Sequence, residues 1–206
     1  VWRALQERGI EIDVVGGTSI GAIMACLIAI DRPIDKAIDI ARRAFSLNPT
    51  GDYNLLPLVS LIKGRRVRTA IRRSIEELVG GPVDIEDLWK GYFCIASNYS
   101  QAREQRIDGG DLEHALLASA AIPGALPPVI RDGDLLCDGG TFNNFPVDAM
   151  REMRGVGKVI GEGIRRASAG LTRARFVDAL ESMGRYDTGG YEIGFSGINA
   201  TVRDYG

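Results

Sequence analysis

The hydrophobic and polar positions of the chain follow two alternating patterns. Short runs rich in β-branched residues are typical of strands, and longer stretches with apolar residues three or four positions apart are typical of helices. Strands are expected at Ile10–Val15, Tyr92–Ser97, Leu135–Cys137 and Lys158–Gly161, and helices at Val1–Arg8, Ile20–Ile30, Pro33–Ala44, Asp111–Ala121 and Pro146–Arg154, with a further helix that ends near Gly80. Because strands and helices alternate, the pattern favours an α/β fold with a largely parallel sheet covered by helices.

Two parts of the chain are less regular. The apolar run Tyr53–Ile62 fits either a strand or a helix. It leads into a cluster of six basic residues, which are Lys63, Arg65, Arg66, Arg68, Arg72 and Arg73. A solvated helix face and a surface that meets anionic lipid head groups are both consistent with that cluster. From Glu162 onward the pattern weakens, so we expect a core over 1–161 and a C-terminal extension of the same domain over 162–206.

Composition limits the possible functions. The 206 residues carry a formal net charge of -2, whereas nucleic-acid binders usually have a basic excess, so no nucleic-acid partner is expected. Hydrophobic residues make up 45% of the chain, which is enough for a core. No run reaches the roughly 18 apolar residues that span a bilayer. The three cysteines are widely spaced and there is one histidine, so we expect buried thiols and neither a metal nor a cofactor. A cytoplasmic location is therefore expected, and peripheral contact with the inner face of a membrane is left open.

The segment Val14–Ile30 carries the most informative motif. It reads VVGGTSIGAIMACLIAI, in which Gly17, Ser19 and Gly21 have the spacing G-x-S-x-G between a predicted strand and a predicted helix. The small flanking residues support a tight turn that exposes the serine at the carboxyl end of a strand, where α/β sheets hold their sites. The backbone N–H of Ile20 is expected to be free at the helix start and able to donate to an oxyanion. We interpret Ser19 as a nucleophile, although chance spacing or a helix cap would also produce the motif.

A serine nucleophile needs a base, and the single histidine is a poor candidate. His114 lies inside an expected helix, which is a poor platform for the histidine of a catalytic triad. Asp138 ends a short apolar strand and is followed by Gly139 and Gly140, so its carboxylate is expected in a tight turn at a strand end. A carboxylate at that position could accept the serine proton directly, although the three residues also fit a plain turn.

Three blocks of sequence together resemble the patatin-like phospholipase family. They are GTSIGA around Ser19, ASAAIPGALPPV over Ala118–Val129 and DGGTFNNFPVDAM over Asp138–Met150. The stretches LLPLVSLIKGRR and GYFCIASNYS, at 55–66 and 91–100, are more similar to the neuropathy-target-esterase branch. Members of that branch are lysophospholipases and often carry upstream cyclic-nucleotide-binding domains.

The resemblance implies a fold and a mechanism. The fold would be a three-layer α/β/α sandwich with a mostly parallel central sheet. Catalysis would use a Ser19–Asp138 dyad and an acyl-enzyme on Ser19, with a phospholipid or lysophospholipid as substrate and no metal or cofactor. Asn143 and Asn144 would brace the loop that holds the aspartate, although an Asx-turn explains them equally well. The family's first strand and glycine-rich oxyanion loop have no counterpart in the chain, so we expect a piece of a longer protein.

Two other functions are consistent with the same residues. An esterase or thioesterase that acts on soluble substrates would use the same chemistry, and it would show no preference for long acyl chains. A catalytically inactive lipid-binding or regulatory module would keep the fold without the chemistry.

Overall fold

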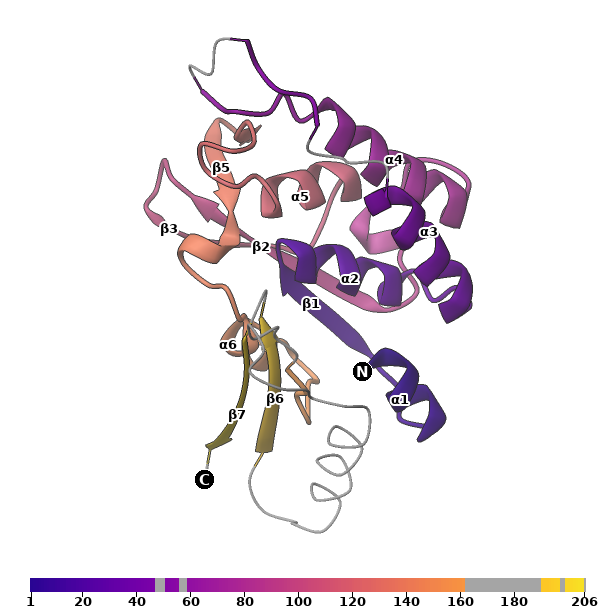
Figure 1. Cartoon of the computed structure of the whole chain (residues 1–206). Coiled ribbons are helices and arrows are strands. Elements are labelled where there is room, and N and C mark those ends of the chain that lie inside the picture. Colours follow the sequence, from indigo (N-terminus) through magenta and orange to yellow (C-terminus); the bar gives the residue numbers. More distant parts are fainter. Residues whose placement is uncertain (47–50, 56–58, 162–189, 197–198, 206) are drawn as a thin grey trace. The chain divides into compact units, whose positions relative to one another are not determined.

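The computed structural model of the protein describes residues 1–46, 51–55, 59–161, 190–196 and 199–205 (Figure 1). The chain forms two compact units. Asp13–Asn144 is the larger unit, and Val1–Ile12 together with Phe145–Gly206 makes up the smaller one. Both candidate catalytic residues therefore belong to the larger unit.

The larger unit is a five-stranded sheet with helices interleaved along the chain. Its strands are β1 (Val14–Thr18), β2 (Gly91–Asn98), β3 (Arg103–Ile107), β4 (Val129–Arg131) and β5 (Asp134–Asp138), and its helices are α2 (Ile20–Ala29), α3 (Ile34–Ser46), α4 (Arg65–Val79) and α5 (Leu112–Ser119), with short 3-10 helices η1 (Ile85–Asp87) and η2 (Gly139–Thr141). Strand β2 is central, since all seven residues from Tyr92 to Asn98 are buried. It pairs with β1 in parallel and with β3 and β5 in antiparallel orientation, and β4 pairs with β5.

Helices α2 and α5 pack against the sheet on one face (Figure 1). The Tyr92 hydroxyl donates to the carbonyl of Ala22 in α2, and the Cys94 thiol donates to the carbonyl of Ala115 in α5. Side chains two positions apart on a strand point to the same face, so both helices lie on that face. Helix α4 packs on α3 and α5 in turn.

The described residues of the smaller unit form two short helices and a hairpin. They are α1 (Trp2–Glu7), α6 (Val147–Arg151), β6 (Gly190–Ser196) and β7 (Asn199–Tyr205), the last two paired antiparallel. Across the parts of both units that the structure describes, no helix combines the length and the apolar character needed to cross a bilayer.

The α/β class and most of the predicted elements are confirmed, and the differences have physical causes. The described sheet is mixed, with one parallel pairing, which corrects the expectation of a mostly parallel sheet. The β2–β3 and β4–β5 connections are tight turns, and tight turns join only antiparallel strands.

Several local features also differ from the sequence predictions. The first strand begins at Val14 rather than Ile10, and Lys158–Gly161 forms no strand. Strands β3 and β4 were not predicted, because REQRI is polar and VIR is only three residues long. The stretch 163–185, expected to be partly helical, lies outside the described residues.

The three cysteines are free and buried, as predicted, and this yields a test of the core. Burial raises the pKa of Cys26 and of Cys94 to about 12, and it also raises that of Cys137. Since the thiolate is the reactive form, iodoacetamide at pH 8 should leave Cys26 and Cys94 unlabelled in the folded protein. In urea all three should react, as counted by mass spectrometry. Labelling of the native protein at the unfolded rate would contradict this packing.

Candidate active site

The carboxyl ends of β1 and β5 meet on one edge of β2. Thr18, the last residue of β1, pairs with Ile95, and Asp138, the last residue of β5, pairs with the next residue, Ala96. Strand β3 pairs with β2 on both sides of this point and so occupies the other edge. The two strands therefore run toward each other along a single edge, and both must turn out of the sheet where they meet. We call this place the strand junction.

Contacts across the strand junction show how close the two turns lie. The Thr18 hydroxyl donates to the carbonyl of Asn143 at 2.8 Å. A Cβ atom added to Gly139 would lie 2.9 Å from the Thr18 methyl group, so the Thr18 side chain lies against the Gly139 backbone. Thr18 directly precedes Ser19, and Gly139 directly follows Asp138. The two candidate catalytic residues are therefore neighbours in space, as adjacent strand ends require.

Ser19 forms the apex of a strained strand-to-helix turn. Its backbone has φ 57° and ψ -122°, a conformation that non-glycine residues rarely adopt. Helix α2 begins at the next residue, and the N–H groups of Ala22 and Ile23 donate to the Ser19 carbonyl at 3.0 and 3.2 Å. The N–H of Ile20 lies in the first turn of the helix, where an amide has no intrahelical acceptor. The local geometry is the one that the G-x-S-x-G motif requires.

The two glycines of the motif differ in what they do for the turn. A Cβ at Gly17 would lie 2.6 Å from the carbonyl oxygen of Gly21 and 2.7 Å from the backbone nitrogen of Ala22. Strand β1 and helix α2 thus approach more closely than a side chain at Gly17 would allow. A Cβ at Gly21 would meet nothing within 4 Å, so the expected supporting role applies to Gly17 on packing grounds and not to Gly21.

This difference can be tested with a matched pair of substitutions. Gly17→Ala should lower the free energy of unfolding by about 3 kcal/mol, because its methyl group overlaps backbone atoms that cannot move independently. Gly21→Ala should change it by less than about 1 kcal/mol, because the position is open and helical. Urea unfolding followed by circular dichroism measures both. Equal effects of the two substitutions would show that the turn is not packed in this way.

A fully buried serine that the sequence analysis did not select holds the turn in place. Ser119, the last residue of α5, accepts a hydrogen bond from the Ser19 N–H at 3.0 Å. The same hydroxyl donates to the Ile95 carbonyl at 2.7 Å. Ser119 thus links two backbone groups at the strand junction. Its only signal in the sequence was its place in the ASAAIPG block, which carried no role for this residue.

Removing the Ser119 hydroxyl should destabilise the protein. Ser119→Ala leaves the Ser19 N–H and the Ile95 carbonyl without this partner inside the core, which typically costs about 1–3 kcal/mol. Ser74→Ala is the matched control, because the Ser74 hydroxyl donates only to the Ala70 carbonyl within α4. Its effect should be several-fold smaller in the same urea titration. A Ser119→Ala midpoint equal to that of the control would refute the role assigned to this hydroxyl.

Asp138 lies at the end of β5 and is only 8% exposed. Its Oδ1 accepts a hydrogen bond from the Gly140 N–H at 2.8 Å, and its own N–H donates to the Ala121 carbonyl at 2.8 Å. A Cβ at Gly140 would lie 3.0 Å from that Oδ1 and 3.1 Å from Oδ1 of Asn144, so the glycine lets the backbone approach the carboxylate. One carboxylate oxygen is thereby held in a defined direction.

The two asparagines predicted to brace the site, and the histidine rejected as its base, differ in how they relate to the strand junction. Asn143 ties the loop after Asp138 to two strands, since its carbonyl accepts from Thr18 and its Nδ2 donates to Glu104 at 2.8 Å. Asn144 is exposed. His114 lies five positions before the last residue of α5, which places it about 7.5 Å along the axis and about 140° around the helix from Ser119.

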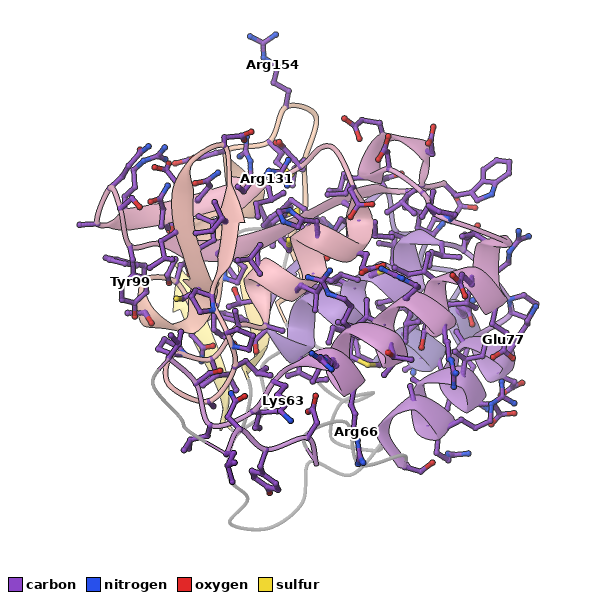
Figure 2. The ribbon with its side chains drawn as sticks, turned by 90° about the horizontal axis from the view of Figure 1, so that it is seen from above. Lys63, Arg66, Glu77, Tyr99, Arg131 and Arg154 are labelled. Atoms are coloured by element: carbon purple, nitrogen blue, oxygen red, sulfur yellow. The ribbon has the colours of Figure 1, made fainter. Side chains whose placement is uncertain are left out.

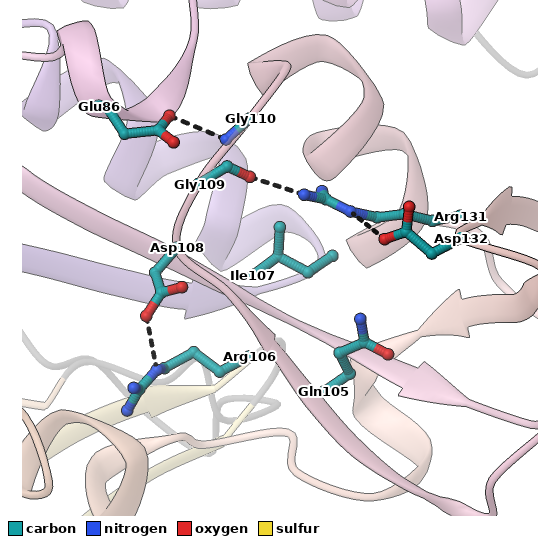
Figure 3. A pocket seen from close by; sticks show the side chains of 9 residues that line it. All are labelled: Glu86, Gln105, Arg106, Ile107, Asp108, Gly109, Gly110, Arg131 and Asp132. Carbon is teal, nitrogen blue, oxygen red and sulfur yellow. Dashed lines mark hydrogen bonds and ion pairs between the residues drawn. The ribbon is translucent and has the colours of Figure 1, made fainter.

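A pocket of about 380 Å³ lies elsewhere in the larger unit (Figure 3). It is lined by residues of η1, β3 and the β4–β5 turn, and its charged groups already have partners. Glu86 accepts from the Gly110 N–H, and Arg131 donates to the Gly109 carbonyl. The pKa of Glu86 is lowered, because its carboxylate accepts hydrogen bonds from its own backbone N–H and from that of Gly110. This polar, internally paired lining does not suit an acyl chain, and neither Ser19 nor Asp138 belongs to it.

Comparison with known proteins agrees with this geometry. A family model described as patatin-like phospholipase matches residues 1–151. The chain belongs to the patatin-like phospholipase family. Over 161 residues it is 37% identical to the patatin-like phospholipase domain-containing protein ZK370.4 of Caenorhabditis elegans, covering 74% of the chain and 11% of that relative.

Two further members of the family carry names that state an activity. The chain is 34% identical over 157 residues to the lysophospholipase NTE1 of Mycosarcoma maydis, covering 74% of the chain and 8% of the relative. It is also 34% identical over 157 residues to the neuropathy target esterase sws of Drosophila melanogaster, covering 73% and 11%. The chain thus spans about a tenth of the length of these relatives. Among solved structures, VipD from Legionella pneumophila aligns with a TM-score of 0.48 and 14% identity, over 89% of the chain and 50% of VipD.

Proposed function

We propose that this patatin-like chain is the core of a serine acyl hydrolase that cleaves a fatty-acyl ester of a phospholipid or lysophospholipid. The observation that carries the proposal is the strand junction, which brings the strained turn of Ser19 beside the buried carboxylate of Asp138. The names lysophospholipase and esterase of two relatives support a lipid ester as the substrate class.

The first half-reaction forms an acyl-enzyme. Ser19 Oγ attacks the ester carbonyl carbon while Asp138 takes the hydroxyl proton, which produces a tetrahedral intermediate with a negative oxygen. We assign the proton to Oδ2 of Asp138, because Oδ1 is held by the Gly140 N–H. The Ile20 N–H at the start of α2 donates to the negative oxygen. The intermediate collapses, the bond to the alcohol oxygen breaks, and Asp138 returns the proton to the leaving alcohol or lysophospholipid.

The second half-reaction restores the enzyme. A water molecule gives its proton to Asp138 and its oxygen attacks the acyl carbon on Ser19. Collapse of the second intermediate breaks the bond to Ser19 Oγ, which regains its proton from Asp138 and releases the fatty acid. No metal or other cofactor takes part in the proposed scheme.

The Ser19–Asp138 mechanism makes a direct prediction for two variants of the 206-residue chain. Ser19→Ala and Asp138→Asn should each lower kcat for lysophospholipid hydrolysis by at least about 10³, because each removes one member of a coupled pair. Asp132→Asn, at an exposed aspartate in the β4–β5 turn, should leave kcat within about twofold. Circular dichroism and urea midpoints show that all the proteins remain folded.

Three outcomes would overturn the proposal in different ways. Turnover that survives Asp138→Asn would remove the aspartate from the mechanism. Hydrolysis of short p-nitrophenyl esters without a preference for longer acyl chains would indicate a soluble ester or thioester as substrate. A folded wild-type chain that binds lipid and hydrolyses neither substrate would be a lipid-binding module.

A further inference from the structure

We propose that the hairpin between α3 and α4 is a docking surface for a bilayer that contains anionic phospholipids. Four large apolar side chains of its described arms are open to solvent: Tyr53 is 69% exposed, Leu55 96%, Val59 67% and Leu61 56%. We call these four residues the apolar face. Single exposed apolar residues are common, whereas four on one short hairpin are unusual and indicate a surface that meets a partner. Residues 56–58 lie outside the described part of the chain and are not included.

In the hairpin the polar side chains of Asn54 and Ser60 are less exposed than the apolar ones. Strands with one solvated face usually turn apolar residues inward and polar residues outward. Here Ser60 is 4% exposed, and its hydroxyl donates to the Ile62 carbonyl at 2.8 Å. Asn54 is half-buried and its Nδ2 donates to the Ser60 carbonyl at 2.7 Å. The Asn54 Nδ2 also donates to the Ser60 hydroxyl at 3.3 Å, so these two polar side chains bond within the hairpin while the four apolar side chains stay exposed.

Backbone hydrogen bonds hold the apolar face in this orientation. Tyr53 and Ile62 form an antiparallel bridge across the two arms. The second arm is fixed to the loop after α5, because two of its backbone N–H groups donate to the carbonyls of Gly124 and Ala125 at 2.8 and 2.9 Å. Figure 1 shows the hairpin extending beyond α4 and α5.

Exposed basic side chains follow the hairpin directly. Lys63, Arg65 and Arg66 are exposed, and Figure 2 labels the side chains of Lys63 and Arg66. Among the described residues no carboxylate forms an ion pair with these three side chains. The Asp52 carboxylate accepts hydrogen bonds from the backbone N–H groups of Arg65 and Arg66. The next two arginines of α4 that face Glu113 are paired with it. An apolar face next to unpaired cations matches a bilayer with anionic head groups, because the apolar residues enter the interface while the cations meet phosphate.

The proposal goes beyond hydrolysis and does not depend on it. It concerns which surface meets the bilayer, and binding is measured without turnover. The Ser19→Ala background keeps vesicles intact, so a failure of the catalytic proposal and a failure of the docking proposal give different results.

The experiment is co-sedimentation of the 206-residue Ser19→Ala chain with sucrose-loaded vesicles of phosphatidylcholine alone or with phosphatidylserine. We expect binding to the anionic vesicles that weakens with added salt. Leu55→Ser/Val59→Ser/Leu61→Ser should weaken vesicle binding at least about tenfold, because three apolar side chains that would enter the bilayer are lost. Lys63→Gln/Arg65→Gln/Arg66→Gln should weaken it by about fivefold per residue and abolish the preference for phosphatidylserine.

Two matched controls use exposed residues outside the hairpin. Trp89→Ser/Ile130→Ser removes two exposed apolar side chains, and Lys36→Gln/Arg42→Gln/Arg43→Gln removes three exposed cations of α3. Both control variants should bind within about twofold of the parent.

The outcomes that would overturn the proposal are distinct. Absence of vesicle binding by the folded parent, or hairpin variants that bind as the controls do, would rule out a bilayer on this face. Self-association of the parent in analytical ultracentrifugation that Leu55→Ser/Val59→Ser/Leu61→Ser abolishes, without vesicle binding, would assign the apolar face to a second copy of the chain.

Discussion

Strands β1 and β5 compete for the same edge of β2, and the candidate site follows from that constraint. Since Thr18 and Asp138 pair with adjacent residues of β2, neither strand can continue. At the end of each strand the backbone must therefore leave the sheet within one residue. One departure is the tight turn of Ser19 into α2, and the other is the Asp138–Gly139–Gly140 turn. The two side chains proposed for catalysis are therefore brought together by strand pairing rather than by any direct contact between them.

The turn at Ser19 is costly to maintain, and its surroundings offset the cost. A non-glycine residue in such a conformation is destabilised by about 1–3 kcal/mol. The Ser119 hydroxyl accepts from Ser19 and donates to Ile95, and Gly17 lets β1 and α2 pack without a side chain between them. Rigid support of this kind keeps a nucleophile in one orientation. The hairpin of the apolar face shows the same principle, because its backbone bonds hold exposed apolar side chains in place.

Local features of the fold and site could be predicted from the sequence. The apolar spacing of Ile20–Ala29 and the capping position of Asp111 depend on residues within one or two helical turns, and the structure agrees with both. Ser19 between glycines and Asp138 before two glycines were identified as strand-end residues for the same reason. Strands β3 and β4 were missed, because a short or polar strand is stabilised by its neighbours rather than by its own pattern.

The sequence by itself determined which residues end strands, which helices are amphipathic and which serine and aspartate carry candidate chemistry. Only the tertiary structure decided that β1 and β5 share one edge of β2, that Ser119 links Ser19 to Ile95, and that the arms of the Tyr53–Ile62 run pair as a hairpin with exposed apolar side chains. These outcomes join residues that are far apart along the chain or depend on what surrounds them. Their energies come from strand pairing and buried hydrogen bonds, which no local pattern of residues contains.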